Sequence, residues 1–204
     1  MKISIEKASP EDSDFIAQTV MGALGKELCM SLAGENNSLE AVHRLFARLG
    51  ANPKSQYSFN NTYIARTECG ENVGAIIAYD GARLRKLRSE FIDAANEILD
   101  WHISEADMLE WGDETGPDQI YIDSLFVLPD YRGRGVGLRL IKHVMACPVY
   151  PDKPFGLLVE KENDKARRLY EKCGFEPVGV SNFFAAPMIH YQNKNYPLSE
   201  CERG

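Results

Sequence analysis

The sequence predicts an α/β fold in which helices cover both faces of one mixed β-sheet. Short apolar runs with strand spacing are separated by longer segments with the spacing of amphipathic helices. Two neighbouring runs, 62–66 and 73–79, are joined by a turn and predict an antiparallel hairpin. A glycine-rich turn at 132–137 follows an apolar run and precedes a helical pattern, which indicates a strand, a loop and a helix in succession.

The first third of the chain predicts one strand and then helices. Residues 3–5 alternate between apolar and polar, as a strand does. Pro10 and the two acidic residues after it open a helix, whose pattern is broken at 34–38. Apolar residues at helical spacing predict a second helix over 39–49, ended by Gly50.

The remainder alternates helices and strands. Residues 83–111 look helical throughout, and a loop follows at 112–118. A strand over 121–128 leads into the glycine-rich turn, and the helix after the turn stops at Cys147-Pro148. The last predicted elements are a strand at 155–160, a helix at 163–173 ended by Gly174, and short strands near 175–180 and 188–191.

Length and composition are those of one globular domain. The chain has 204 residues, of which 44% are hydrophobic and 26% charged. We expect a single domain over 1–204, because no repeat, low-complexity stretch or linker divides the sequence. The longest apolar stretches fall short of the ~18 residues of a membrane span, and the first residues lack a secretory pattern. We therefore expect a cytoplasmic protein with no membrane partner.

Charge and cysteine content argue against several kinds of site. A net charge of −7 opposes binding to nucleic acid and suits a cationic substrate such as an amine. The five cysteines are odd in number and widely spaced, without a C-x-x-C pair. We therefore expect free thiols, with neither a disulfide framework nor a metal site.

Residues 132–137 read Arg-Gly-Arg-Gly-Val-Gly and predict a turn that binds a diphosphate. Glycines let the backbone approach a ligand, successive N–H groups converge on the anion, and the helix start adds its positive dipole end. The alternation of Gly133, Gly135 and Gly137 excludes a Rossmann fingerprint, and no P-loop string occurs. R-x-x-G-x-G remains, beginning at Arg132. The alternative is a surface turn that is merely rich in glycine.

Three segments together resemble the GNAT (GCN5-related) N-acetyltransferase superfamily. The glycine-rich turn is similar to that family's coenzyme A loop. Residues 122–131 are similar to its I-x-x-L-x-V-x-P-x-Y lead, and residues 163–175 to its N-x-x-A-x-x-L-Y-x-x-x-G-F motif. The order of elements also resembles the family's topology over nearly the whole chain. The main departure is a helical insertion at about 83–118.

The resemblance implies a GNAT fold, with a mixed, mostly antiparallel sheet of six to seven strands. It implies acetyl-CoA as the acetyl donor and a primary amine as the acceptor, with a small-molecule amine favoured. No cysteine falls where the thioester is expected, so we expect direct attack without an acyl-enzyme. The alternatives are a protein N-terminal or lysine acetyltransferase, and a module that binds acyl-CoA without turnover. A homodimer is a further option.

The resemblance assigns cofactor binding to the strand end, the loop and one helix start. The backbone of 125–127 is expected to pair with the pantetheine amides, and the Val127 amide to point at the thioester oxygen. Asn163 can cap its helix, contact the cofactor, or do both. The expected cofactor-binding residues are Leu125, Phe126, Val127, Arg132, Gly133, Arg134, Gly135, Val136, Gly137, Leu138 and Asn163.

Tyr170 is the general acid that the resemblance implies. A phenol of pKa ~10 can protonate the departing thiolate, whose conjugate acid has a pKa near ~8.5. On helical spacing alone, Tyr170 would be a core residue.

The general base is less sharply defined. An alkylammonium must lose a proton before it attacks, and a carboxylate acting through water, or water alone, can accept that proton. The resemblance implies a carboxylate base on the strand over 121–128 or on the next one, so Asp123 is the first candidate. It lies on the strand face of Tyr121 and Leu125 by the two-residue period, and it can equally be a structural carboxylate. Glu160 is the second candidate. Weaker candidates on the last strand are His190 and Tyr191.

Residues 105–118 are acidic and contain neither lysine nor arginine. They are either a lip that attracts a cationic acceptor or, more simply, a solvated loop after a helix. Their spacing is not that of an EF-hand, so we expect no metal there.

Overall fold

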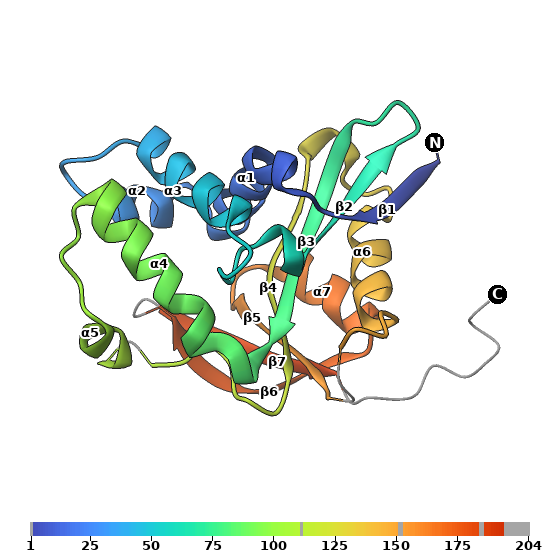
Figure 1. Cartoon of the computed structure of the whole chain (residues 1–204). Coiled ribbons are helices and arrows are strands. Elements are labelled where there is room, and N and C mark those ends of the chain that lie inside the picture. The colour runs from blue at the N-terminus through green and yellow to red at the C-terminus, as the bar shows by residue number, and fades with distance from the viewer. Residues whose placement is uncertain (1, 111, 151–152, 184–185, 194–204) are drawn as a thin grey trace.

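A seven-stranded mixed sheet organises the protein (Figure 1). The computed structural model describes residues 2–110, 112–150, 153–183 and 186–193. The strand order is β1-β2-β3-β4-β5-β7-β6, and only the pairing of β4 with β5 is parallel. This confirms the predicted sheet. The strands are β1 (Ile3–Lys7), β2 (Thr62–Thr67), β3 (Asn72–Asp80), β4 (Ile120–Val127), β5 (Phe155–Glu160), β6 (Phe175–Phe183) and β7 (Ala186–Asn193).

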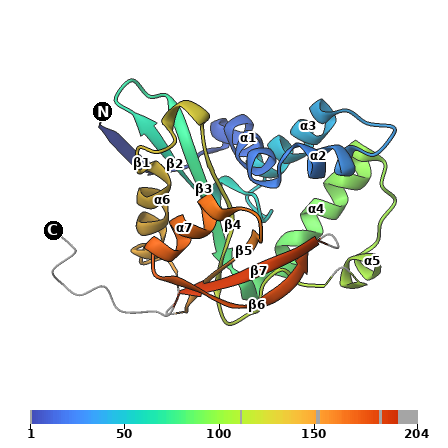
Figure 2. The same cartoon turned by 180° about the vertical axis from the view of Figure 1, so that it is seen from behind.

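Helices cover both faces of the sheet, as predicted. One group packs on the first face: α1 (Ser13–Leu24), α2 (Lys26–Ala33), α3 (Leu39–Ala51) and α4 (Leu84–Leu99). The other face carries α6 (Val136–Met145) and α7 (Asp164–Lys172), seen best from behind (Figure 2). The short α5 (Glu105–Glu110) follows α4. Gly25, with a φ of 82°, separates α1 from α2, a break that the helical pattern did not reveal.

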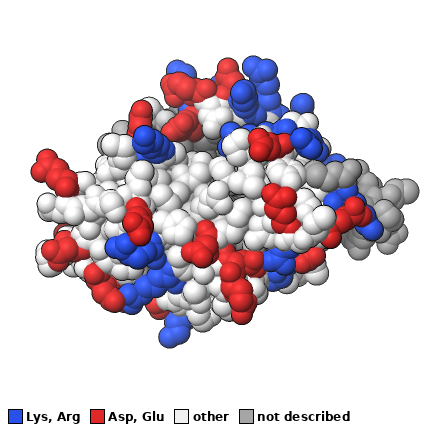
Figure 3. Space-filling model, turned by 90° about the horizontal axis from the view of Figure 1, so that it is seen from above, with Lys and Arg blue, Asp and Glu red and all other residues white. Residues whose placement is uncertain are grey.

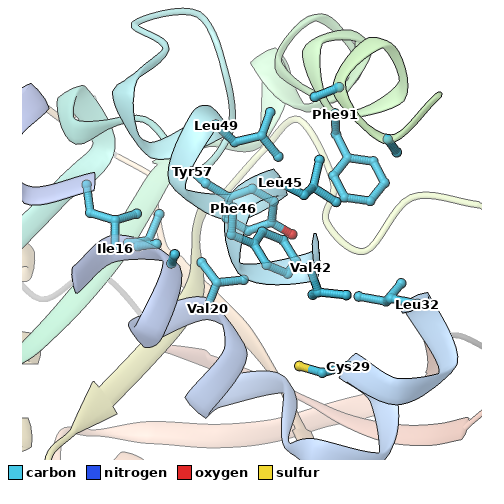
Figure 4. Close-up of a cluster of buried hydrophobic side chains, with 14 of the residues drawn as sticks. Ile16, Val20, Cys29, Leu32, Val42, Leu45, Phe46, Leu49, Tyr57 and Phe91 are labelled. Carbon is cyan, nitrogen blue, oxygen red and sulfur yellow. The ribbon is translucent and has the colours of Figure 1, made fainter. Parts of the chain in front are cut away.

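Each face has its own hydrophobic core. Between α1, α2, α3 and α4, the side chains interlock around the rings of Phe46, Tyr57 and Phe91 (Figure 4). The Phe46 and Tyr57 rings meet edge to face, with centroids 5.2 Å apart. The second core joins the other sheet face to α6 and α7. The sheet is therefore held rigidly from both sides.

The sheet opens between β4 and β5. Their parallel register contains only the pairs Ile120–Phe155 and Tyr121–Gly156 among the described residues. Beyond this point β5 turns away with β6 and β7, which run across the lower part of Figure 1 at a steep angle to β3. Residues 122–127 consequently have no strand partner on that side, and an opening lies in the middle of the sheet.

A β-bulge at Asp123 changes which side chains share a face. The register between β3 and β4 shifts between Ile77 and Ala78 and skips Asp123. Asp123 lies on the α4 face with Tyr121, as predicted. The prediction for Leu125 is wrong, because the extra residue turns Leu125 to the α6–α7 face.

The predicted helix over 83–111 is interrupted after α4. Asp100 and His102 have left-handed φ angles of 57° and 54°, which end the helix. The Asn96 side chain then holds the chain by hydrogen bonds to both the N–H and the C=O of Ile103. Asn96 thus replaces helical hydrogen bonds with local ones.

Surface and composition show few extremes. Acidic and basic side chains are intermixed around the face seen from above, whose centre is uncharged (Figure 3). Four cysteines are free thiols, and Cys201 lies outside the described residues. In the part of the chain that is described, no helix combines the length and hydropathy needed to cross a membrane.

Candidate active site

The glycine-rich loop runs from the 3-10 turn Pro129–Tyr131 to the start of α6. Gly133 and Gly135 have φ angles of 73° and 78°, which strongly favour glycine. A Cβ atom at either position would meet nothing within 4 Å, so this stretch of backbone is open to a ligand. Gly135 is also the N-cap of α6, whose first amides have no helical acceptor. These are the features of an anion site.

Gly137 has a different role from the one that its place in the motif suggests. A Cβ atom there would lie 3.1 Å from Leu169 Cδ2 of α7, so Gly137 lets two helices approach closely. Val136 is buried and Leu138 is half-buried in the same core. Residues 136–138 thus place side chains in the core while their amides stay at the helix start.

Two exposed arginines flank the loop. The Arg132 Nε donates a hydrogen bond to the Val127 carbonyl at 2.9 Å, and its guanidinium lies 5.6 Å from the centroid of the Phe126 ring. Arg134 lies 5.5 Å from the centroid of the Tyr131 ring. Arg132 therefore ties the loop to the end of β4, and both arginines add positive charge where a diphosphate would sit.

The free edge of β4 presents main-chain donors to the opening. The Leu128 N–H donates to the Val73 carbonyl on the β3 side. Because N–H groups alternate along a strand, those of Leu125 and Val127 point the other way, toward the space that β5 has left. An extended ligand with amides can pair with them as an added strand.

An apolar groove of about 710 Å³ begins beside Phe126, on the sheet face that α1, α2 and α3 cover. Gly22 of α1 makes room for the Phe126 ring, because a Cβ there would lie 2.3 Å from it. Residues from the first helices line the groove, among them Phe15, Met21, Cys29 and Leu39. The groove opens on the face that carries Asp123.

Tyr170 projects from α7 into the core below β4. It is 9% exposed and packs against Phe175 with ring centroids 6.0 Å apart. Burial, with a smaller effect of Cys173, raises the pKa of Tyr170 to about 12. The hydroxyl is thus protonated at neutral pH, as a general acid must be, and has no hydrogen-bond partner within the described residues. Burial also raises the pKa of Cys173 to about 11, which makes this thiol a poor nucleophile.

Asn163 is the N-cap of α7. Its side-chain oxygen accepts a hydrogen bond from the Ala166 N–H at 3.1 Å, and the residue is exposed. The capping role is confirmed, and contact with a cofactor stays a prediction.

Asp123 lies in a polar cluster on the α4 face. Its carboxylate accepts hydrogen bonds from the Tyr79 hydroxyl at 3.0 Å and the Ser124 hydroxyl at 2.9 Å. Burial raises its pKa to about 6, against the opposing effects of these two bonds, Arg88 and Gln56. Asp123 is therefore ionised at neutral pH and is a stronger base than an ordinary aspartate.

Arg88 and Glu114 join this cluster, although the sequence interpretation missed both roles. The Arg88 guanidinium of α4 is 8% exposed, donates to the Gly112 carbonyl at 2.9 Å and pairs with the Glu114 carboxylate. Burial raises the pKa of Glu114 to about 7; Arg88 lowers it, and the charge of Asp123 adds to the rise. The view of 105–118 as a solvated loop is thus wrong for Glu114, whose side chain is 10% exposed.

The other candidate bases lie outside this cluster. Glu160 is exposed at the end of β5. His190 forms a hydrogen bond with Gln119 Oε1 at 3.1 Å, and burial lowers the pKa of His190. The buried Tyr191 donates to Glu171 at 3.0 Å, a structural bond. The described residues contain no group of three or more histidine, cysteine, aspartate or glutamate side chains that could hold a metal ion.

Tyr170 and Asp123 approach the opening from opposite sides of the sheet. Tyr170 belongs to the α6–α7 core, and Asp123 to the α4 face. Tyr170 is near enough to contribute to the raised pKa of Tyr121, the neighbour of Asp123 on that face. A thioester laid along β4 can therefore meet a base on one side and an acid on the other.

More than half of the chain matches a known protein family. A family model described as an acetyltransferase (GNAT) domain matches residues 59–177, more than half of the chain. The chain belongs to the GNAT acetyltransferase family. The matched region contains the hairpin, the free edge of β4, the glycine-rich loop and Tyr170. The resemblance inferred from the three motifs is therefore confirmed.

The chain is also similar to two bacterial proteins and to a solved structure. Peptidyl-lysine N-acetyltransferase YjaB of Salmonella typhimurium is 32% identical over 80 residues, 38% of this chain and 47% of that protein. The Escherichia coli protein of the same name is 33% identical over 78 residues, 38% and 46% of the two chains. The chain spans about half the length of these curated relatives. An N-acetyltransferase from Staphylococcus aureus Mu50 shares the fold, with a TM-score of 0.73, 21% identity and coverage of 93% and 99%.

Proposed function

We propose that this protein transfers the acetyl group of acetyl-CoA to a primary amine, and that a small-molecule amine is the favoured acceptor. One observation carries the proposal: the opening beside β4 has free main-chain donors along it and an anion-binding loop at its end. Acetyl-CoA is the donor that the family uses, and its parts match these features. The diphosphate would lie on the amides of 133–138, and the pantetheine arm along 125–127.

The reaction balances with groups on this chain. The amine nitrogen attacks the thioester carbonyl carbon, and the Val127 N–H stabilises the oxygen that becomes negative. Asp123, directly or through water, takes the proton that the ammonium loses. The C–S bond then breaks, and Tyr170 gives its proton to the thiolate. The attacking nitrogen loses its second proton, which returns to the Tyr170 phenolate directly or through water. The products are an N-substituted acetamide and coenzyme A, and solvent takes the first proton from Asp123.

The acceptor is the part that needs most support. Arg88 holds residues 112–114 beside Asp123 by its bonds to Gly112 and Glu114. This favours an enclosed site and a small amine. A lysine side chain is the second candidate, favoured by the names of the two bacterial relatives. The cytoplasmic location, the homodimer and the extent of the domain stay predictions of the sequence.

Release of thiol from acetyl-CoA tests the proposal. The panel contains small primary amines, a peptide with an internal lysine, and a peptide with a free N-terminus only, and mass spectrometry identifies the acetylated product. We expect amine-dependent release with stoichiometric acetylation, fastest with a small amine. Faster acetylation of the lysine peptide would favour the second candidate. Binding of coenzyme A without release for any acceptor would contradict the proposal and favour a binding module.

A further inference from the structure

We propose that the acceptor binds as a cation, an aliphatic ammonium held between Asp123 and Glu114 with the side chain of Gln56. This inference rests on the proposed function and specifies the chemical class of its acceptor. It concerns four polar residues on the α4 face, called here the acceptor cluster: Gln56, Arg88, Glu114 and Asp123.

The acceptor cluster has more negative than positive charge. The Arg88 guanidinium pairs with the Glu114 carboxylate, and its charge also lowers the pKa of the second buried carboxyl group, Asp123. A third carboxylate, Asp113, lies 3.5 Å from Arg88 but is more exposed and pairs with Arg85 at 3.0 Å. With both buried carboxylates ionised, one negative charge in the cluster lacks a partner. A buried charge without a partner is costly, and a bound ammonium removes that cost.

Gln56 gives a separate indication that the acceptor cluster lacks a hydrogen-bond donor. It lies in a buried loop, is 4% exposed, and its backbone is fixed by a hydrogen bond from Asn61 Nδ2 at 3.0 Å. Its side-chain amide interacts with the Asp123 carboxylate and lowers the pKa of that group. Gln56 Oε1 has no hydrogen-bond partner among the described residues, although it is fully buried. An unpaired acceptor of this kind costs free energy, and an ammonium beside Asp123 brings N–H donors to it.

Three tyrosines surround the acceptor cluster and suit a cation. Tyr57 comes from the loop after α3, Tyr79 from β3 and Tyr121 from β4. Burial raises the pKa of all three well above the usual value, and the charges of Asp123 and Glu114 both add to each rise. All three are therefore neutral, and the rings of Tyr79 and Tyr121 meet edge to face at 5.8 Å. Neutral aromatic rings attract an ammonium and carry no positive charge of their own that would pair with the carboxylates.

A pair of amines of similar size and different charge tests this inference. Benzylamine is a cation at neutral pH, whereas aniline is neutral. We expect the wild type to prefer benzylamine, and Glu114→Gln to raise the KM for benzylamine about tenfold, which is the effect of losing one charge-assisted contact. The KM for aniline should change less than twofold. Asp113→Asn is the matched control, because it alters the adjacent carboxylate that also contacts Arg88, and it should behave as the wild type.

A second variant keeps the inference testable if the Glu114→Gln protein does not fold. Gln56→Met removes the unpaired Oε1 atom at similar side-chain volume and should raise the KM for benzylamine several-fold. Gln119→Met is its control, because this buried glutamine already bonds to Thr115 and His190. Binding of coenzyme A, measured by calorimetry, reports whether each variant is folded.

Two results would overturn the inference while leaving the proposed function intact. One is equal use of benzylamine and aniline by the wild type. The other is a KM for benzylamine that neither Glu114→Gln nor Gln56→Met changes in folded protein. If no amine releases thiol, the proposed function fails instead. Calorimetric binding of benzylamine to the protein saturated with coenzyme A then still tests the inference, which predicts weaker binding in both variants than in their controls.

Discussion

Single residues in this site owe their chemistry to their surroundings. Asp123 is an aspartate in a strand, and nothing in the adjacent sequence distinguishes it from a structural carboxylate. Its side chain lies on the α4 face, where burial raises its pKa to about 6. Tyr170 changes in the same direction, to about 12. The proposed base is therefore ionised and the proposed acid protonated at neutral pH, which is the pairing that amine acetylation needs.

The pH dependence of kcat/KM should reveal the base. A carboxyl group accepts a proton only when ionised, so kcat/KM should fall as the pH falls through about 6 to 7. The apparent values belong to Asp123 and Glu114 together, because the two groups interact in the presence of Arg88. Asp123→Asn should lower kcat about 100-fold and remove this inflection. An unchanged profile in the variant would assign the base elsewhere, with Glu160 the next residue to replace.

Replacing Tyr170 separates acid catalysis from packing. Tyr170→Phe keeps the ring and removes the proton donor, so kcat should fall about 100-fold while the KM for acetyl-CoA stays unchanged. Tyr191→Phe is the control, since Tyr191 is a tyrosine of the same core with a hydroxyl bonded to Glu171. Steady-state kinetics on both variants measure the difference. Equal losses in the two would mean that Tyr170 is only structural.

At the scale of elements, local signals were predictable and long-range ones were not. The loop at 132–137 was recognisable because left-handed φ angles at Gly133 and Gly135 favour glycine, so backbone geometry is visible in the sequence. The bulge in β4 was not, because it depends on register against β3. The helix break after α4 was missed because the left-handed residues that end the helix, Asp100 and His102, are not glycines.

The sequence contained a signal for the buried ion pair of Arg88. It lies on the apolar stripe of α4, in register with Leu84, Leu87 and Phe91, and all four are buried. A charged residue on a buried helix face needs a partner of opposite charge. The acidic segment that follows α4 supplied candidates, and Glu114 is the one that pairs with it.

Replacing Arg88 should therefore destabilise the insertion at about 83–118. Arg88→Met leaves the buried Glu114 carboxylate without its partner, which should cost about 3 kcal/mol of unfolding free energy. Urea denaturation measures this loss. Arg85→Met is the control, because Arg85 pairs with Asp113 at a site where its own side chain is 72% exposed, and it should cost under about 1 kcal/mol. Equal costs would mean that the Arg88–Glu114 pair does not hold the segment.

In the molecule as a whole, the proposed reaction depends on the opening between β4 and β5. In the proposed mechanism two substrates meet there from opposite faces, with Tyr170 on one side and Asp123 on the other. The fold class and the hairpin followed from the sequence patterns and the three motifs, which also predict the donor site. The proposed acceptor cluster did not, because its residues come from the loop after α3, from α4, from residues 112–114 and from β4, which only the folded chain brings together.

Direct attack within one complex predicts a kinetic pattern. Both substrates must be bound before the acetyl group moves, so double-reciprocal plots at several amine concentrations should intersect. Cys173 does not offer a covalent route, because burial keeps its thiol protonated. Parallel lines, with an acetylated protein found by mass spectrometry, would instead indicate an acyl-enzyme.

A crystal structure of the protein with coenzyme A would show whether the cofactor occupies the opening beside β4. We expect the diphosphate on the main-chain amides of 133–138 and the pantetheine arm paired with the N–H groups of Leu125 and Val127. We also expect the sulfur in the opening, between Tyr170 and Asp123. Coenzyme A bound away from the β4 edge, or an opening closed by side chains in the complex, would contradict this expectation.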